Sequence, residues 1–300
     1  MAGRTLEIHT DWSVLREYFS LHYQLFVQEP PGASGEDYNT AFRERAEKLN
    51  NFAPVTVPIS VRAAGELTAS TGHSIAEYLQ DVFLVANLAA PGALNLSRAT
   101  LKNADGGSSI DIRFDCGIFD SAWIDSLRLA YPPVRQINVE KVLSWFRKLE
   151  FGKRQLAEKG PVKALFCLLH LAEGWELEPT ALLWISHGLE GLYSVPNALS
   201  FNFLRERLAL LLEADAGQKQ HLARGIRALY DMRNAFAHGG MSIARPHASE
   251  VIDPRVDDTF ERLLHNRDFG ARLLVASLQS MIQRELFELE FKETLCVGAT

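Results

Sequence analysis

The sequence contains few cysteines, and the three present, Cys116, Cys167 and Cys296, lie far apart. An odd number at such spacing forms neither a disulfide framework nor a metal-binding cluster. Cys167 falls within an apolar run, so we expect it in the core. The chain also lacks an apolar run long enough to cross a bilayer, and it has no apolar signal segment near residue 1. We therefore expect a cytoplasmic protein that does not enter a membrane.

The chain also lacks an excess of basic charge. Its 31 Lys and Arg against 37 Asp and Glu give a formal net charge of −6. This balance argues against a protein that coats nucleic acid through bulk electrostatics, but it permits a nuclease with a small local site. With 47% hydrophobic residues in 300 positions, the chain can bury a full core.

Residues 1–135 have the mixed pattern of an α+β domain. Short amphipathic helices are predicted near residues 12–19 and 42–49, separated by a Pro- and Gly-rich loop at 29–35. Alternating residues predict a strand through Val55, Val57, Ile59 and Val61. An apolar run predicts a second strand at 82–85. Strict apolar–charged alternation at 109–115 predicts a third, which a turn at 105–107 places in a hairpin.

The Tyr-Pro-Pro break at residues 131–133 marks the predicted domain boundary. Residues 136–300 then read as an all-α helical bundle with short connections. Asn138 is expected to cap the first helix, Pro161 to lie in the first turn of the second, and Pro179 to open the third. The mostly apolar second helix is expected at the centre of the bundle. Ser200 begins a fourth helix, a fifth runs from about 217 to 238, and a last helix ends near residue 286.

The end of the fifth helix carries the candidate chemistry. Leu222, Ile226, Leu229 and Ala237 recur at helical spacing, and the two glycines after His238 predict a left-handed stop. Arg233 and His238 are five residues apart. Asn234 lies one helical turn before His238, at a spacing where its amide can hold the imidazole in place.

The pattern Tyr-Asp-x-Arg-Asn-x-x-x-His-Gly-Gly resembles the signature of the HEPN superfamily (higher eukaryotes and prokaryotes nucleotide-binding). The surroundings look most like its Apea-like branch, with Leu189-Glu190 on an upstream helix and Arg205 to Arg207 on the next. The resemblance spans about residues 139–288. It implies an all-α HEPN bundle, a homodimer with a composite site, and a metal-independent endoribonuclease that acts on RNA without a cofactor. It also implies a role in toxin–antitoxin or antiphage systems, with an antitoxin or regulatory partner.

The motif residues suit RNA cleavage, in which the 2′-hydroxyl of the substrate is the nucleophile. The reaction needs a base, an acid and positive charge near the phosphate. His238 suits acid or base work because imidazole titrates near neutrality. Arg233 suits phosphate because its planar fork stays charged. We expect Asn234 to orient His238, and one imidazole in each chain makes a second copy the source of the other group.

Three further residues are candidates for support. Glu190 is expected either to hold Arg233 or to lie exposed on its helix. Tyr230 is expected either to stack on a base or to belong to the core. Arg227 is one of seven cations around the motif, against four carboxylates, and an exposed helix face explains any one of them equally well.

Two alternatives remain open from the sequence. Arg233 can form a salt bridge to Glu190 while His238 only caps the helix. The chain can also be a catalytically inactive HEPN dimer that binds RNA or nucleotide, or that scaffolds a partner protein. A basic cleft between two motif helices would favour the enzyme, and a buried, salt-bridged Arg233 would favour the scaffold. The N-terminal domain is expected to sense a signal or select a substrate.

Overall fold

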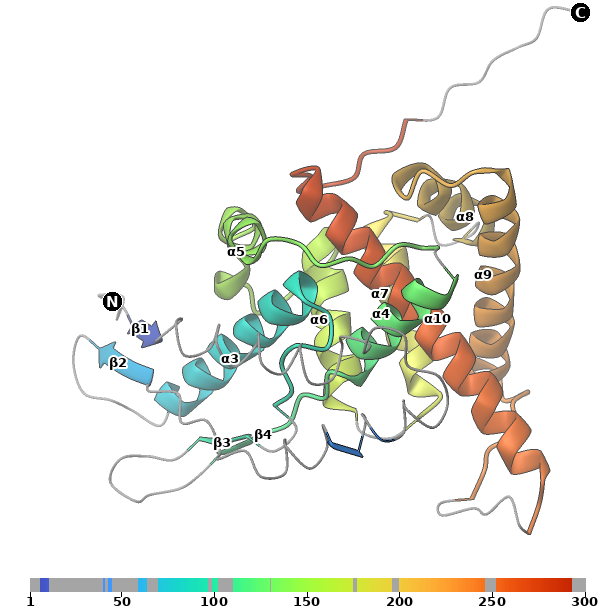
Figure 1. Cartoon of the computed structure of the whole chain (residues 1–300), viewed down its shortest axis with the longest axis horizontal. Coiled ribbons are helices and arrows are strands. Elements are labelled where there is room, and N and C mark those ends of the chain that lie inside the picture. The colour runs from blue at the N-terminus through green and yellow to red at the C-terminus, as the bar shows by residue number, and fades with distance from the viewer. Residues whose placement is uncertain are drawn as a thin grey trace, which may run out of the picture.

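The computed structural model of the chain is mostly helical (Figure 1). It describes residues 6–10, 40, 43–44, 59–63, 70–96, 99–101, 110–129, 131–174, 177–195, 200–245 and 252–292. Within these ranges, none of the helices combines the length and apolar character that a membrane crossing requires.

The described elements before residue 131 include two short antiparallel strand pairs and the helices α3 (Ser70–Ala89) and α4 (Gly117–Leu129). Strand β1 (Leu6–Thr10) pairs with β2 (Ile59–Ala63), and β3 (Ala99–Leu101) pairs with β4 (Ile110–Ile112). The alternating segment at 109–115 therefore does contain a paired strand. The helix expected at 12–19, most of that at 42–49, Val55, Val57 and the turns at 29–35 and 105–107 lie outside the described residues.

The strand predicted at residues 82–85 is wrong, because these residues form part of α3. Val82, Phe83, Leu84 and Val85 are all buried, with exposed fractions of 3% or less. A short run that is apolar on every side gives no periodicity, so it cannot distinguish a buried helix from a buried strand. The burial of this segment against several neighbours decides in favour of the helix.

The second half of the chain forms the predicted helical bundle. Its elements are α5 (Val139–Lys148), a 3₁₀ turn η1 (Phe151–Lys153), α6 (Gly160–Glu173), α7 (Thr180–Leu192), α8 (Ser200–Leu211), α9 (Ala216–Ala237) and α10 (Arg255–Gln283). Local signals set several of these ends. The Asn138 side chain accepts from the Glu140 N–H at 2.8 Å, and Pro161 lies in the first turn of α6.

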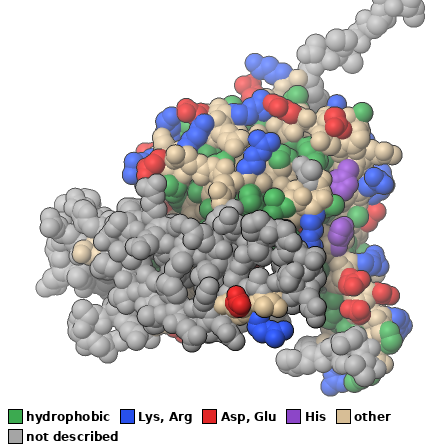
Figure 2. All heavy atoms as spheres, in the orientation of Figure 1, with side chains coloured by type: hydrophobic (Ala, Val, Ile, Leu, Met, Phe, Trp, Pro, Cys, Tyr) green, Lys and Arg blue, Asp and Glu red, His purple; other side chains and the backbone are tan. Residues whose placement is uncertain are grey.

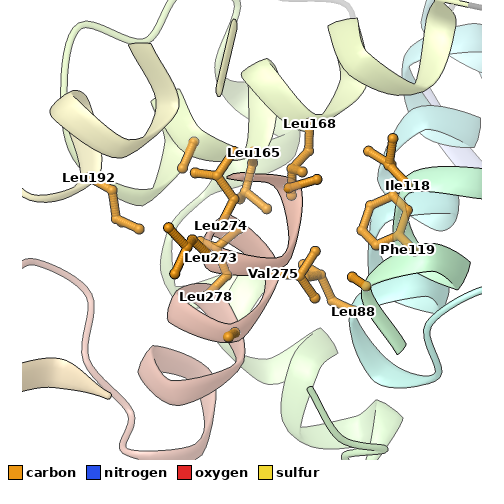
Figure 3. Close-up of a cluster of buried hydrophobic side chains, with 14 of the residues drawn as sticks. Leu88, Ile118, Phe119, Leu165, Leu168, Leu192, Leu273, Leu274, Val275 and Leu278 are labelled. Atoms are coloured by element: carbon orange, nitrogen blue, oxygen red, sulfur yellow. The ribbon is translucent and has the colours of Figure 1, made fainter. Parts of the chain in front are cut away.

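The central helix is α10, whereas the sequence favoured α6. Every residue of α10 from 269 to 279 is buried, which covers three turns on all sides. All of the helices from α3 to α9 contact it. Figure 3 shows side chains from α3, α4, α6 and α7 gathered around Leu274, Val275 and Leu278 of α10. Helices from both sides of the predicted boundary at residue 135 thus contribute to one core.

Two long polar side chains of α10 lie inside this core. Gln279 accepts from the Arg135 N–H at 2.8 Å and donates to the carbonyls of Arg135 and Leu88, at 2.6 and 2.9 Å. It therefore satisfies backbone groups of α3 and of the segment before α5. Arg272 is 1% exposed and lies 3.8 Å from the Asp125 carboxylate of α4. Burial lowers the pKa of Arg272, and the nearby carboxylates oppose that shift.

Candidate functional site at the end of α9

Hydrogen bonds to backbone groups cap helix α9 at both ends. At its start, Asp215 and Gln218 form a reciprocal capping box, with distances of 2.8 and 2.9 Å. At its end, Gly239 adopts a φ of +74°, which favours glycine. The Gly240 N–H donates to the Ala235 carbonyl at 2.7 Å, and the Gly239 N–H donates to Phe236. These bonds form a Schellman motif. The predicted stop after His238 is confirmed.

The buried face of α9 packs closely on α10. Leu222, Ile226 and Leu229 are fully buried, whereas Ala237, predicted on the same stripe, is exposed at the helix end. Gly225 permits this approach, because a Cβ at that position would overlap the ring of Phe269. The contact places the motif-bearing end of α9 rigidly on the central helix.

Arg233 is held by its neighbour in the sequence. Its Nη1 donates to Oδ1 of Asn234 at 2.9 Å. Its Nε is buried and has no hydrogen-bond partner, and within the described residues no carboxylate forms an ion pair with it. The guanidinium is therefore half-buried, fixed at one corner and not neutralised by a protein anion.

Asn234 therefore has a different role from the predicted one. Its side-chain oxygen binds Arg233, and among the described residues no side-chain hydrogen bond joins it to His238. Residues four apart on a helix project only about 40° from each other, so Asn234 and His238 share a face. Arg233 alone would point about 140° away from His238. The bond to Asn234 ties the guanidinium to a residue that shares a helix face with His238.

His238 follows the last residue of α9 and is exposed. Its backbone N–H donates to the Asn234 carbonyl at 2.9 Å, which completes the helix end. Its imidazole has no hydrogen-bond partner within the described part of the chain. A solvent-accessible imidazole can exchange a proton with a bound substrate.

Glu190 and Tyr230 form a pair that the sequence did not predict. The Tyr230 hydroxyl donates to Oε1 of Glu190 at 2.9 Å, joining α9 to α7. Burial first, and then the Glu190 carboxylate, raises the pKa of Tyr230 well above its usual value, so the hydroxyl remains a donor. Tyr230 is 6% exposed and belongs to the core, so its ring is not available to stack on a base. Glu190 binds Tyr230, and the predicted contact with Arg233 is not formed.

Several of the surrounding cations have local partners. The guanidinium carbon of Arg227 lies 4.9 Å from the ring centroid of Phe201 on α8, and Arg205 pairs with Glu206 at 3.2 Å. Arg207, for which no specific role was predicted, donates to the carbonyls of Tyr193 and Ser194 at 2.8 Å each. Arg207 thereby caps α7, the helix that carries Glu190. The sequence alone could not predict this cap, because it depends on the geometry of the loop that follows α7.

The positive charge at the site comes from a few side chains and is not part of a large basic surface on the face that Figure 2 draws. On the face drawn in Figure 2, acidic and basic side chains are interspersed over the described surface. Among the described residues, no group of three or more His, Cys, Asp and Glu side chains is arranged to hold a metal ion. The arrangement thus offers one cation and one imidazole on a rigid helix end.

Comparison with known proteins does not assign this chain: neither a family model, nor a curated protein, nor a solved structure matches it.

Proposed function

We propose that this chain is a metal-independent endoribonuclease of the HEPN type, and that Arg233 and His238 act on the scissile phosphate. The observation that carries the proposal is the Arg233–Asn234 contact at 2.9 Å, which ties the guanidinium to a residue on the helix face of the exposed His238. The guanidinium suits the charge that develops on the phosphate, because its planar fork donates two charged hydrogen bonds.

In this proposal the 2′-hydroxyl of RNA attacks the adjacent phosphorus and the bond to the 5′-oxygen breaks. One imidazole accepts the 2′-hydroxyl proton, and a second group donates a proton to the departing 5′-oxygen. The products are a 2′,3′-cyclic phosphate and a 5′-hydroxyl, with no net change in protons. Since one chain supplies one His238, we propose a homodimer in which the partner copy supplies the second. A role in toxin–antitoxin or antiphage defence belongs to the same proposal.

The alternative is a catalytically inactive HEPN dimer that binds RNA or nucleotide, or that scaffolds a partner. Within the described residues, no second titratable side chain forms a hydrogen bond or ion pair with His238, and this favours the alternative for a single copy. Arg233 is half-exposed and forms no ion pair with a described carboxylate, which supports the enzyme, because a scaffold would be expected to bury it in a salt bridge.

The deciding experiment is RNA cleavage in EDTA by the wild type and by His238→Ala. We expect the wild type to leave 2′,3′-cyclic phosphate ends and His238→Ala to be slower by about 10²–10⁴-fold. The control is His187→Ala, which removes an exposed histidine from α7. An RNA with 2′-O-methyl groups should resist cleavage, since it lacks the nucleophile. Binding without cleavage by the wild type would favour the inactive dimer, and equal cleavage by His238→Ala would reject this site.

A further inference from the structure

A cavity of about 560 Å³ lies between α3, η1 and α6, and none of its described lining residues belongs to α9. Four of the described lining residues are Phe or Tyr, and together they are called the aromatic wall here. They are Tyr78 of α3, Phe114 after β4, Phe151 of η1 and Phe166 of α6. Phe151 and Phe166 meet edge to face, with ring centroids 5.5 Å apart. Since aromatic faces carry negative electrostatic potential, this wall attracts both methylene groups and cations.

The same cavity is lined by three carboxylates, from Glu77 and Asp81 of α3 and Glu173 of α6. Within the described residues, none of the three makes a hydrogen bond or an ion pair. Among the described lining residues, Arg154 is the one Lys or Arg, and it is exposed. His170 also lines the cavity, but its ring stacks on Trp184 with centroids 4.0 Å apart. The described lining therefore carries more negative than positive charge.

Among these carboxylates, Asp81 is the one whose burial and pKa are most unusual. It is largely buried, and burial, followed by repulsion from Glu77, raises its pKa to about 7. Gly152 lies close to the Asp81 carboxyl group. A Cβ added at Gly152 would be 3.0 Å from Asp81 Oδ2. A buried carboxyl group usually has a partner in the protein, and a strongly shifted group in a cavity is a candidate for ligand binding.

We propose that this cavity binds a small organic dication or polyamine, whose ammonium groups pair with Asp81 and Glu77 while its methylene chain packs on the aromatic wall. The charge of the lining disfavours phosphate-bearing ligands, which would meet three carboxylates. The described side chains also provide no cluster arranged for a metal ion. This inference does not depend on the proposed nuclease activity, because the cavity and the end of α9 share no described residue.

The charges that face Asp81 set the pH dependence of binding. Glu77 lies one turn before it on α3, Arg154 follows η1, and His170 and Glu173 come from α6. An ammonium ion binds the ionised form of Asp81 and displaces its proton. Affinity should therefore rise about tenfold between pH 6 and pH 8, as the carboxyl group titrates near 7.

The test is calorimetric titration of the full chain with spermidine, with 1,4-butanediol as an uncharged probe. At pH 8 we expect saturable binding of one spermidine per chain, at least tenfold weaker in Asp81→Asn and weaker in Glu77→Gln. Glu261→Gln, which removes an exposed carboxylate from α10, should bind like the wild type. Thermal unfolding of each variant shows whether it is folded.

The proposal is overturned by any of three results. The first is no saturable binding of spermidine to the wild type. The second is equal weakening by Asp81→Asn and Glu261→Gln, which would indicate attraction to the acidic surface as a whole. The third is binding of butanediol as tight as that of spermidine. Because the readout is binding, none of these results depends on whether RNA is cleaved.

Discussion

At the scale of single residues, Arg233 and Asn234 are expected to contribute to RNA cleavage in different ways. Arg233→Lys keeps the charge but loses the planar fork, so we expect RNA cleavage to fall by about 10²–10³-fold. Asn234→Ala keeps the guanidinium but removes the hydrogen bond that Arg233 makes to Asn234, so we expect a smaller loss of about tenfold. Arg224→Lys, an exposed change on the same helix, should leave the rate unchanged. Equal rates for wild type and Arg233→Lys would remove Arg233 from the chemistry.

Also at the scale of single residues, the raised pKa of Asp81 predicts that the stability of the protein depends on pH. Its pKa is about 7 in the fold and near 3.8 in the unfolded chain, so the folded state binds the proton more tightly. Ionisation therefore lowers the free energy of unfolding progressively as pH rises from about 4 to 7, and the loss is constant above that range. We expect Asp81→Asn to stabilise the protein at pH 8, on the order of a few kcal/mol, and to have no effect near pH 4.

Urea denaturation at both pH values, with the exposed Asp231→Asn as control, measures the effect of Asp81. A pH-independent gain in Asp81→Asn would mean that the carboxyl group is not the source of the difference.

At the scale of elements, the end of α9 depends on one glycine. Gly239 has a φ of +74°, where a Cβ is strained, whereas a Cβ at Gly240 would make only ordinary contacts, at 3.7 Å from the Ala235 carbonyl oxygen. We expect Gly239→Ala to cost about 1 kcal/mol of stability and to lower cleavage by loosening His238. Gly240→Ala is the matched control. Equal stability of the two variants, measured by thermal unfolding, would show that the left-handed turn does not position the motif.

The elements that the sequence predicted well are those whose ends have local causes. Asn138, Pro161 and the glycine after His238 act through bonds or dihedral angles within a few residues, so they could be read directly. The run at 82–85 and the central position of α10 depend on neighbours distant in the sequence, and they were missed. At the site, residue types and spacing indicated Arg233 and His238 as candidates. The Tyr230–Glu190 bond was not predicted, because it joins residues 40 positions apart on two helices. That pairing requires the packed structure.

At the scale of the whole molecule, Gln279 links the two parts of the chain. Gln279→Leu would leave the buried Leu88 carbonyl and the partly buried N–H and carbonyl of Arg135 without these hydrogen bonds. Each such group costs about 1–3 kcal/mol, so we expect a loss of several kcal/mol in one cooperative unfolding transition. Gln283→Leu, at an exposed position of the same helix, is the control. Two transitions, with only the first affected, would show that the parts unfold separately.

The central place of α10 also has a consequence for synthesis. Residues 255–283 leave the ribosome after every helix from α3 to α9, yet those helices all pack against them. The earlier helices therefore emerge with the apolar faces that α10 covers still exposed, and α9 lacks its packing on α10 until that helix arrives. We expect the nascent chain to need protection by chaperones, and to gain any activity of α9 only once α10 has been made.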